Sequence, residues 1–415
     1  MKFKKDYSRG SVLKVEKSAL SFVSSIKEDL LKFYDSSYSS LLLPTDAELL
    51  DSVSVLVQNK DKYSTLVVVG IGGSNLGSLA VLEAVKGKHH ILNNFKKVFF
   101  ADTVDPDNIS SILNACEGDD FLLLFISKSG TTVESFANFE VFLSKIPLSQ
   151  RKDRVLTICD SDSVLANYSK VNNFDSLFIP KKVGGRFSVF SAVGLFPLAF
   201  AGVDIDELRR GAEDALKTFN KNSIALQGAL DLYYNYSQGK VINDLFLFNN
   251  DLESLGKWYR QLMGESLGKR FNLQGREVFL GITPTVSIGS TDLHSVGQLY
   301  LGGPRDKFTS FVSLKNQTRV VVPKNKGAIL KNLQGLSFSD IMGAILKGTM
   351  RAYKKNNLPF NHYELDAKSE YELGFFMQTK MFEIMILAHL LGVNPFDQPS
   401  VEDYKVETRK LLDKK

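Results

Sequence analysis

Cysteine is scarce in this chain, which has only Cys116 and Cys159 among its 415 residues. The two do not have the spacing of a metal site, and Cys159 lies in the apolar run RVLTIC. We therefore expect two buried thiols in a protein of a reducing compartment.

The chain also lacks an apolar run long enough to span a bilayer. The longest candidate, at 189–203, is broken by Pro197 and is too short to cross. The N-terminus, MKFKKDYSRG, has no apolar core of the kind found in signal peptides. These absences predict a soluble, cytoplasmic protein without a membrane partner.

Neither sign of charge dominates the sequence. The 51 basic and 46 acidic residues leave a net charge of +5, and the lysines are spread along the chain with some enrichment at both ends. This mild balance argues against a nucleic-acid-binding patch. With 44% hydrophobic residues, the composition is that of an ordinary globular protein of two or three domains.

What the sequence does contain is a regular alternation of apolar runs with helix-length segments, which predicts parallel α/β sheets. The expected strands are 65–70, 97–101, 121–126, 154–159, 176–180, 241–249, 278–283, 308–314, 318–323 and 361–366. Helices are expected around 190–238, at 339–356, near 370–391 and at 400–413. We predict an N-terminal helical segment at 1–45, α/β domains at 46–190 and 191–391, and a C-terminal helical segment at 392–415 that packs back on the active site.

The segment Phe121–Thr132, FLLLFISKSGTT, changes abruptly from apolar residues to hydroxyls and one lysine. A buried strand followed by a helix places the polar residues in a turn at the carboxyl end of the sheet, where backbone N–H groups and the helix dipole favour an anion. The turn predicts a phosphate site, while an ordinary helix cap with a polar turn fits the spacing equally well.

A second glycine-rich turn, GIGGSNLG at Gly70–Gly77, also follows an apolar strand. It is not a dinucleotide fingerprint, because Asn75 occupies the position of the last glycine. It is not a Walker loop either, because Ser78 and Leu79 follow it. A small anionic ligand beside both turns fits better, and a turn needed only for tight packing is the alternative.

Three charged residues further along the chain are candidate catalytic residues. Arg186 follows two glycines and could stabilise an oxyanion, although a surface ion pair is the usual role of a lone arginine. Glu265 lies in a glycine-flanked turn after an apparent helix, where most carboxylates are only solvated. Lys405, near the start of the last helix, would ordinarily be a surface residue.

Among the five histidines, His294 is the best acid–base candidate because it lies early in a helix among polar residues. We expect His89, His90 and His362 on the surface and His389 in the core.

Six motifs in a fixed order decide between these interpretations: GIGGSNLG, SKSGTT, GGRFSVFSAVG, GESLGK, STDLHSVGQ and NPFDQPSVEDYK. Together they resemble the glucose-6-phosphate isomerase family over most of the chain. The resemblance implies two α/β sugar-isomerase-type domains with parallel-rich sheets flanked by helices, plus terminal helices. It also implies an aldose–ketose isomerase of glycolysis and gluconeogenesis that interconverts glucose 6-phosphate and fructose 6-phosphate with no cofactor and no metal.

The resemblance assigns roles residue by residue. Glu265 matches the base that moves a proton between C2 and C1 through a cis-enediol, Arg186 lies beside the enediolate, and His294 and Lys405 help to open the ring. The implied substrate-binding residues are Gly73, Ser74, Ser127, Lys128, Ser129, Thr131, Thr132, Gln261 and Gln398.

In this family the histidine comes from the neighbouring subunit, so the resemblance implies a homodimer. Glu134 matches a carboxylate that orients this histidine. A non-catalytic sugar-phosphate-binding regulator of the same fold is one alternative, although it would not need Glu265, His294 and Lys405 together. An isomerase that also accepts mannose 6-phosphate is the other, because the epimers differ at one hydroxyl.

The sequence departs from the family pattern in three places. Ser400 replaces a glycine, which would cost stability if that glycine needs a positive φ. Lys181 stands where an acidic or small polar residue is usual, and the segment from Glu265 to His294 is longer than in compact bacterial members.

Overall fold

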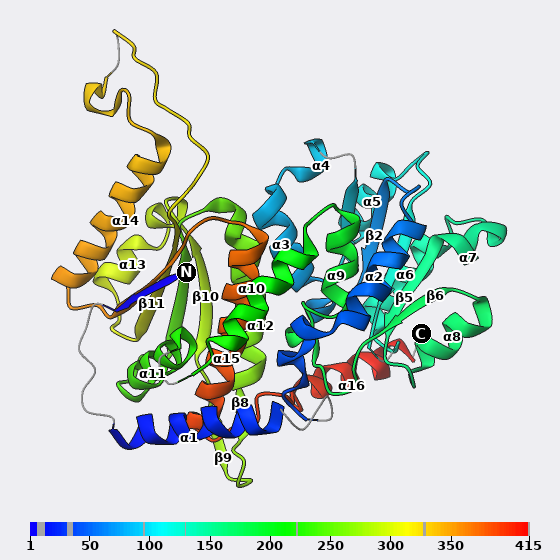
Figure 1. The fold of residues 1–415 in the computed structure, drawn as a ribbon, viewed down its shortest axis with the longest axis horizontal. Coiled ribbons are helices and arrows are strands. Elements are labelled where there is room, and N and C mark those ends of the chain that lie inside the picture. The colour runs from blue at the N-terminus through cyan, green and yellow to red at the C-terminus, as the bar shows by residue number, and fades with distance from the viewer. Residues whose placement is uncertain are drawn as a thin grey trace.

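The computed structural model of the chain describes residues 1–5, 13–30, 36–93, 96–128, 130–220, 223–326 and 329–413. Two sheets lie side by side, each flanked by helices, and helices from both units meet between them (Figure 1). The predicted α/β class with parallel-rich sheets is thereby confirmed. The domain boundaries within the chain stay a prediction.

The first sheet consists of five parallel strands in the order β3-β2-β4-β5-β6. These are β2 (Thr65–Val69), β3 (Lys97–Ala101), β4 (Leu122–Ile126), β5 (Val155–Cys159) and β6 (Asp175–Phe178). Every residue of β2, β4 and β5 is buried, as expected for strands covered by helices on both faces. The helices before and between these strands are α1 (Leu13–Leu30), α2 (Ala47–Asn59), α3 (Leu76–Lys86), α4 (His90–Asn93), α5 (Pro106–Ala115), α6 (Val133–Leu143), α7 (Arg151–Arg154) and α8 (Val164–Asn172).

The second sheet has the order β1-β12-β11-β7-β10. Its parallel strands are β7 (Ile242–Leu247), β10 (Thr283–Ile288), β11 (Lys307–Leu314) and β12 (Phe360–Leu365). The helices that follow β6 along the chain are α9 (Ala192–Phe200), α10 (Ile205–Lys217), α11 (Ile224–Ser237), α12 (Glu253–Leu267), α13 (Gly297–Gly302), α14 (Phe338–Lys355), α15 (Glu370–Leu391) and α16 (Val401–Leu412). Of these, α9 packs against α2, α3 and β2 of the first unit, and α16 lies below the first sheet (Figure 1). A separate antiparallel ribbon is formed by β8 (Lys269–Phe271) and β9 (Glu277–Leu280).

One continuous apolar cluster joins the two units. It includes Leu124 of β4, Leu195 of α9, Trp258 of α12 and Met385 of α15. Helix α3 of the first unit packs against α12 of the second. Because α12 is held from both sides, the polar residues of its last turn have fixed positions relative to the loops of both sheets.

Three sequence predictions are wrong in detail. Residues 2–5, expected in a helical segment, form β1 (Lys2–Lys5), which pairs antiparallel with the outer edge of β12. Phe3 packs against Tyr363 there, with ring centroids 4.9 Å apart, so pairing and packing together select the strand. The strand expected at 278–283 instead spans the end of β9 and the start of β10, and the second sheet uses Thr283–Ile288.

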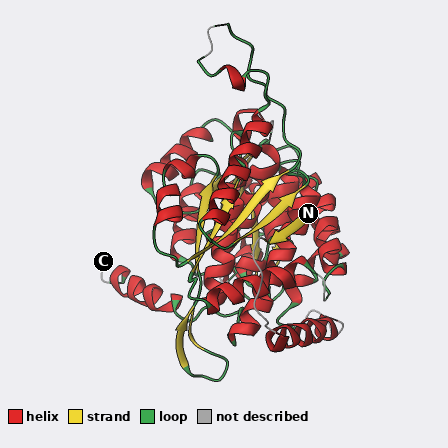
Figure 2. Cartoon of the chain, turned by 90° about the vertical axis from the view of Figure 1, so that its left-hand side faces the viewer, coloured by secondary structure: helices red, strands yellow, loops and turns green. Residues whose placement is uncertain are grey.

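The strand expected at 318–323 is also absent from the described residues, apart from one bridge between Val321 and Ser337. This stretch projects from the body of the molecule between β11 and α14 (Figures 1 and 2), where no sheet edge is available to pair with it. Among the described residues, none of the helices is both long and apolar enough to cross a bilayer.

Candidate active site

The predicted anion-binding turn connects the carboxyl end of β4 to α6. Ser127 is buried, and its hydroxyl accepts a hydrogen bond from the backbone N–H of Gly130 at 3.1 Å. Gly130 has a φ of +75°, and a Cβ there would lie 2.7 Å from the Cβ of Leu165. The turn therefore needs glycine both for its backbone conformation and for its packing. Ser129, a predicted phosphate contact, lies outside the described residues.

A cavity of about 670 Å³ opens over this turn, lined by Ser127, Lys128, Thr131 and Thr132 together with Ser74 of the glycine-rich turn. Five of the predicted substrate-binding residues thus share one cavity. Thr132 is the N-cap residue of α6, so the N-terminal end of this helix borders the same space. The arrangement suits a small anion.

Lys128 and Lys181 both line this cavity, together with the carboxylates of Asp160 and Asp162. The Lys128 ammonium group donates hydrogen bonds to the carbonyl oxygens of Lys181 and Val183, at 2.6 and 3.1 Å. Partial burial lowers the pKa of Lys128, and the nearby Asp160 carboxylate acts in the opposite direction. The ammonium group of Lys181 lies 2.7 Å from the Asp162 carboxylate.

The glycine-rich turn lies between this cavity and α12. A Cβ on Gly73 would lie 2.2 Å from the carbonyl carbon of Gly185, so the two backbones can touch only because no side chain intervenes. On the other side, Gly72 faces the amide group of Gln261, and a Cβ on Gly72 would lie 2.9 Å from Gln261 Nε2. Ser74 thus borders the anion cavity, while Gly72 borders the residues described next.

Arg186 is 2% exposed, and all five N–H groups of its guanidinium donate hydrogen bonds within the protein. Nη1 donates to Glu265 Oε2 at 3.0 Å and to Gln398 Oε1 at 2.8 Å, and Nε donates to Ser266 Oγ at 2.9 Å. Nη2 donates to two carbonyl oxygens, those of Pro395 and Asp397. Burial lowers the pKa of Arg186, but Glu265 and Asp397 oppose this effect.

Glu265 lies in the last turn of α12 and not in a turn after it, which corrects the sequence prediction. Its Oε1 accepts a hydrogen bond from Gln261 Nε2 at 3.0 Å, one helical turn earlier, while Oε2 faces Arg186. These two hydrogen bonds fix the direction of the Glu265 carboxylate, while 28% of its side chain stays exposed and accessible to a small molecule. This is the arrangement that a positioned general base requires.

Sequence reasoning missed Lys269 and Asp397, which complete the cluster. The Lys269 ammonium donates to the backbone carbonyl of Glu265 at 2.9 Å and to Asp397 Oδ1 at 2.8 Å. Burial lowers the pKa of Lys269, and Asp397 opposes this effect. Both residues occur in the quoted motifs GESLGK and NPFDQPSVEDYK, but nothing in the spacing of either motif indicates that they meet.

The C-terminal segment reaches Arg186 through residues 395–398. Gln398, Ser400 and Glu265 line a second cavity of about 670 Å³. Ser400 has a φ of −67°, so serine fits the start of α16 without backbone strain. Lys405 lies one turn into α16, where its ammonium contacts Glu402 Oε1 at 2.7 Å, and no described residue of α16 is buried.

His294 ends a 3₁₀ turn, Thr291–His294, just before α13, and not in the early part of a helix as expected. Its side chain is exposed, and its ring makes no hydrogen bond or ion pair with any described residue. Asp292 anchors the turn by accepting a hydrogen bond from the N–H of Ile288 at 2.7 Å. Glu134 lies in the first turn of α6, close to Thr132.

The structure therefore brings Arg186, Gln261, Glu265 and Gln398 together and places Gly73, Ser74 and the Ser127 turn beside them. It does not bring His294 or Lys405 into contact with this cluster within one chain. In the part of the chain that the structure describes, no three His, Cys, Asp or Glu side chains are grouped to hold a metal ion.

Comparison with known proteins gives consistent results. A family model described as phosphoglucose isomerase matches residues 48–415. A glucose-6-phosphate isomerase of Methanocaldococcus jannaschii is 33% identical over 392 residues, covering 91% of this chain and 94% of the relative.

Two solved structures extend this similarity. A hypothetical protein from Thermus thermophilus has a TM-score of 0.86 and 30% identity, with 99% of this chain and 100% of that chain covered. A glucose-6-phosphate isomerase from Chlamydia trachomatis has a TM-score of 0.79 and 22% identity, covering 96% of this chain and 78% of that one. At this lower identity the second structure supports the fold alone.

Proposed function

Because the chain belongs to the phosphoglucose isomerase family, we propose that it catalyses the reversible isomerisation of glucose 6-phosphate and fructose 6-phosphate. The observation that carries this proposal is the arrangement of Glu265, held by Gln261 and Arg186, at the boundary between the two sheets. The predicted place in glycolysis and gluconeogenesis follows from this activity, and we propose the cytoplasm as its location.

The phosphate of the substrate binds in the cavity over the Ser127 turn. Its negative charge is met by Lys128, by the hydroxyls of Thr131 and Thr132 and by the N-terminal end of α6. Because the phosphate is remote from the reacting carbons, its binding energy orients the sugar over Glu265.

The Glu265 carboxylate removes the proton from the carbon next to the carbonyl group. The electrons of that C–H bond form the C1–C2 double bond, and the carbonyl oxygen becomes an enediolate. A positioned base of this kind contributes roughly 10²–10⁴-fold to the rate. The proton of the neighbouring hydroxyl group moves to the oxygen that has become negative, and Glu265 returns its proton to the other carbon, whose oxygen becomes the new carbonyl. No electrons enter or leave the sugar, so the reaction needs no redox cofactor.

The charge of the Arg186 guanidinium stabilises the negative oxygen as it forms, while its five N–H groups stay bonded within the protein. These hydrogen bonds hold the guanidinium in place before the substrate arrives, so it need not reorganise during the reaction. The same contacts fix the direction of Glu265.

Ring opening is assigned to Lys405 and His294, as the family resemblance implies. His294 is exposed and makes no contact with Glu265 in its own chain, which supports its use by a second copy. We propose a homodimer in which each His294 completes the site of the partner, with Glu134 orienting it.

The proposal is tested by a coupled assay that detects glucose 6-phosphate formed from fructose 6-phosphate in the presence of chelator. The wild type should turn over, and Glu265→Gln should lose roughly 10²–10⁴-fold or more while still binding the sugar phosphate. Glu253→Gln, on the first turn of the same helix, is the matched control and should remain active. A wild type that binds fructose 6-phosphate without turnover would instead support the regulator.

A further inference from the structure

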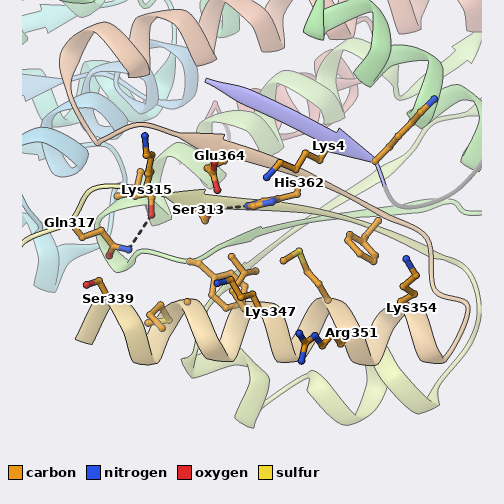
Figure 3. Close-up of a pocket in the computed structure, with 18 residues that line it drawn as sticks. Lys4, Ser313, Lys315, Gln317, Ser339, Lys347, Arg351, Lys354, His362 and Glu364 are labelled. Carbon is orange, nitrogen blue, oxygen red and sulfur yellow. Dashed lines mark hydrogen bonds between the residues drawn. The ribbon is translucent and has the colours of Figure 1, made fainter. Parts of the chain in front are cut away.

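A groove of about 760 Å³ lies on the second sheet, between α14 and the strands β1, β11 and β12. It shares no lining residue with the two cavities of the candidate active site. Figure 3 shows α14 along one side and the sheet on the other, with Lys4 and His362 on the sheet side and Lys347 and Arg351 on the helix side. Its volume lies within the range of about 300–1,000 Å³ that is usual for small-molecule sites.

The floor of the groove is apolar and well ordered by packing. Phe248 and Phe360 are almost fully buried in the sheet, and Leu346 is buried beneath α14. Met342 and Met350, on the same helix, are partly exposed towards the groove. Methionine side chains adapt to the faces of flat ligands, so the floor suits a planar apolar group.

The rim of the groove is strongly basic. Six basic side chains line it against a single carboxylate, that of Glu364; the six are Lys4, Lys5, Lys315, Lys347, Arg351 and Lys354. Within the described residues, no carboxylate lies at ion-pair distance from Lys4, Lys5, Lys347 or Arg351, and Lys315 has Asp366 only at 3.9 Å.

Uncompensated charges of one sign on two facing walls repel each other and favour an anionic occupant. His362 lies between the walls, and its Nε2 is 2.8 Å from the Ser313 hydroxyl. An anion here would therefore face cations from β1 and from α14 at once.

We propose that this groove binds an organic polyanion with a flat apolar part, of which a nucleoside polyphosphate is the simplest example. The planar part lies on Met342, Met350 and Phe360, and the charged part lies between Lys4 and the pair Lys347 and Arg351. The proposal adds a second ligand site to the protein and does not depend on the isomerase assignment.

Isothermal titration of the full chain with ATP, in chelator and at low ionic strength, tests this site. Saturating fructose 6-phosphate is added to occupy the phosphate cavity of the candidate active site. ATP should still bind, and inorganic triphosphate should bind at least about tenfold more weakly, because it cannot use the apolar floor.

The variant Lys347→Glu/Arg351→Glu should weaken ATP binding by about tenfold or more, and Lys4→Glu on the opposite wall should act in the same direction. Lys355→Glu makes the same charge change as Lys4→Glu, and half that of the double variant, at a residue of α14 that does not line the groove, and it should bind ATP like the wild type. All variants should keep the wild-type urea unfolding midpoint, which confirms that they fold.

Four outcomes would overturn the proposal. The first is competition between ATP and fructose 6-phosphate, the second is triphosphate binding as tight as that of ATP, and the third is a loss of affinity in Lys355→Glu equal to that of the double variant. The fourth is absence of ATP binding by the wild type; a changed oligomeric state in the double variant would then assign the groove to a protein contact.

Discussion

Arg186 Nη1 lies 3.0 Å from Glu265 Oε2, although 79 positions separate the two residues in the chain. Arg186 belongs to the 3₁₀ turn Gly185–Phe187 that follows the first sheet, and Glu265 belongs to α12 in the second unit. The pair therefore forms only when both units are folded and packed together. A change that separates the two units would therefore also move Arg186 away from the proposed base, Glu265.

Replacement of Arg186 by lysine should damage both activity and stability. Lysine keeps the charge but cannot serve five acceptors in a fixed plane, so buried carbonyl groups lose their donors. We expect kcat to fall by about 10²–10³-fold and the free energy of unfolding to fall by about 1–3 kcal/mol. Steady-state kinetics and urea unfolding measure the two effects.

Arg154→Lys is the control for this prediction. Arg154 is 5% exposed and binds the carbonyl of Phe121 at 3.0 Å and Asp120 at 2.9 Å, away from the candidate site. It should lose stability while keeping kcat. Equal loss of kcat in both variants would show that Arg186 acts only through stability.

Lys405→Ala should impair ring opening selectively. We expect kcat on the cyclic substrate to fall by about 10²-fold, with turnover of an open-chain hexose phosphate analogue almost unchanged. Lys410→Ala is a closely matched control, because Lys405 and Lys410 each contact a glutamate three residues earlier on α16 at 2.7 Å. Similar losses on both substrates would remove the ring-opening role.

A mixture of two inactive variants should recover activity if each site uses both subunits. Glu265→Gln and His294→Ala chains, unfolded and refolded together, should form mixed dimers with one intact site each. In a symmetric dimer the expected recovery is about a quarter of the wild-type activity. Recovery no greater than the residual activities of the separate variants would place His294 and Glu265 of one chain in the same site.

His362 should make stability depend on pH. Burial lowers its pKa below the ordinary value of 6.5, with Glu364 opposing and Lys4 reinforcing the shift. As the pH falls through 6.5, the unfolded chain binds a proton that the folded chain does not, so the free energy of unfolding decreases. This contribution is fully present above pH 6.5.

The urea concentration at the unfolding midpoint should accordingly be lower at about pH 5.5 than at about pH 7.5. The difference should be smaller in His362→Gln, whose side chain can still form a hydrogen bond with Ser313. Other titrating groups are common to both proteins and cancel in the comparison. An identical fall in the two proteins would contradict the role of His362.

Much of the fold could be predicted because its signals are local. Apolar runs such as 121–126 and 154–159 suit central strands of a parallel sheet, and the structure has strands there, at Leu122–Ile126 and Val155–Cys159. The Ser127 turn and the Gly73 turn were predicted as ligand sites from their positions at strand ends, and the structure brings Ser127 and Ser74 to one cavity.

Some of the remaining errors are local: His90, expected on the surface, is 4% exposed, and its Nδ1 lies 3.0 Å from the carbonyl oxygen of Gly87. Others concern contacts between distant parts of the chain. His362 was expected on the surface, but it faces α14 within the second sheet and is 7% exposed. The cluster of Lys269 and Asp397 likewise joins residues 128 positions apart. No local pattern encodes such partners, because a single side chain does not indicate which distant backbone will approach it.

The antiparallel strand β1 has a consequence for the order in which the protein assembles. Lys2–Lys5 pairs with β12, and the amino group of Met1 lies 3.2 Å from Glu372 Oε1, a partner 371 positions later. This segment leaves the ribosome long before its partner strand, so it is among the last to find its place. Until β12 has been synthesised it has no native edge to join, and closure of the second sheet is a post-translational event or nearly so.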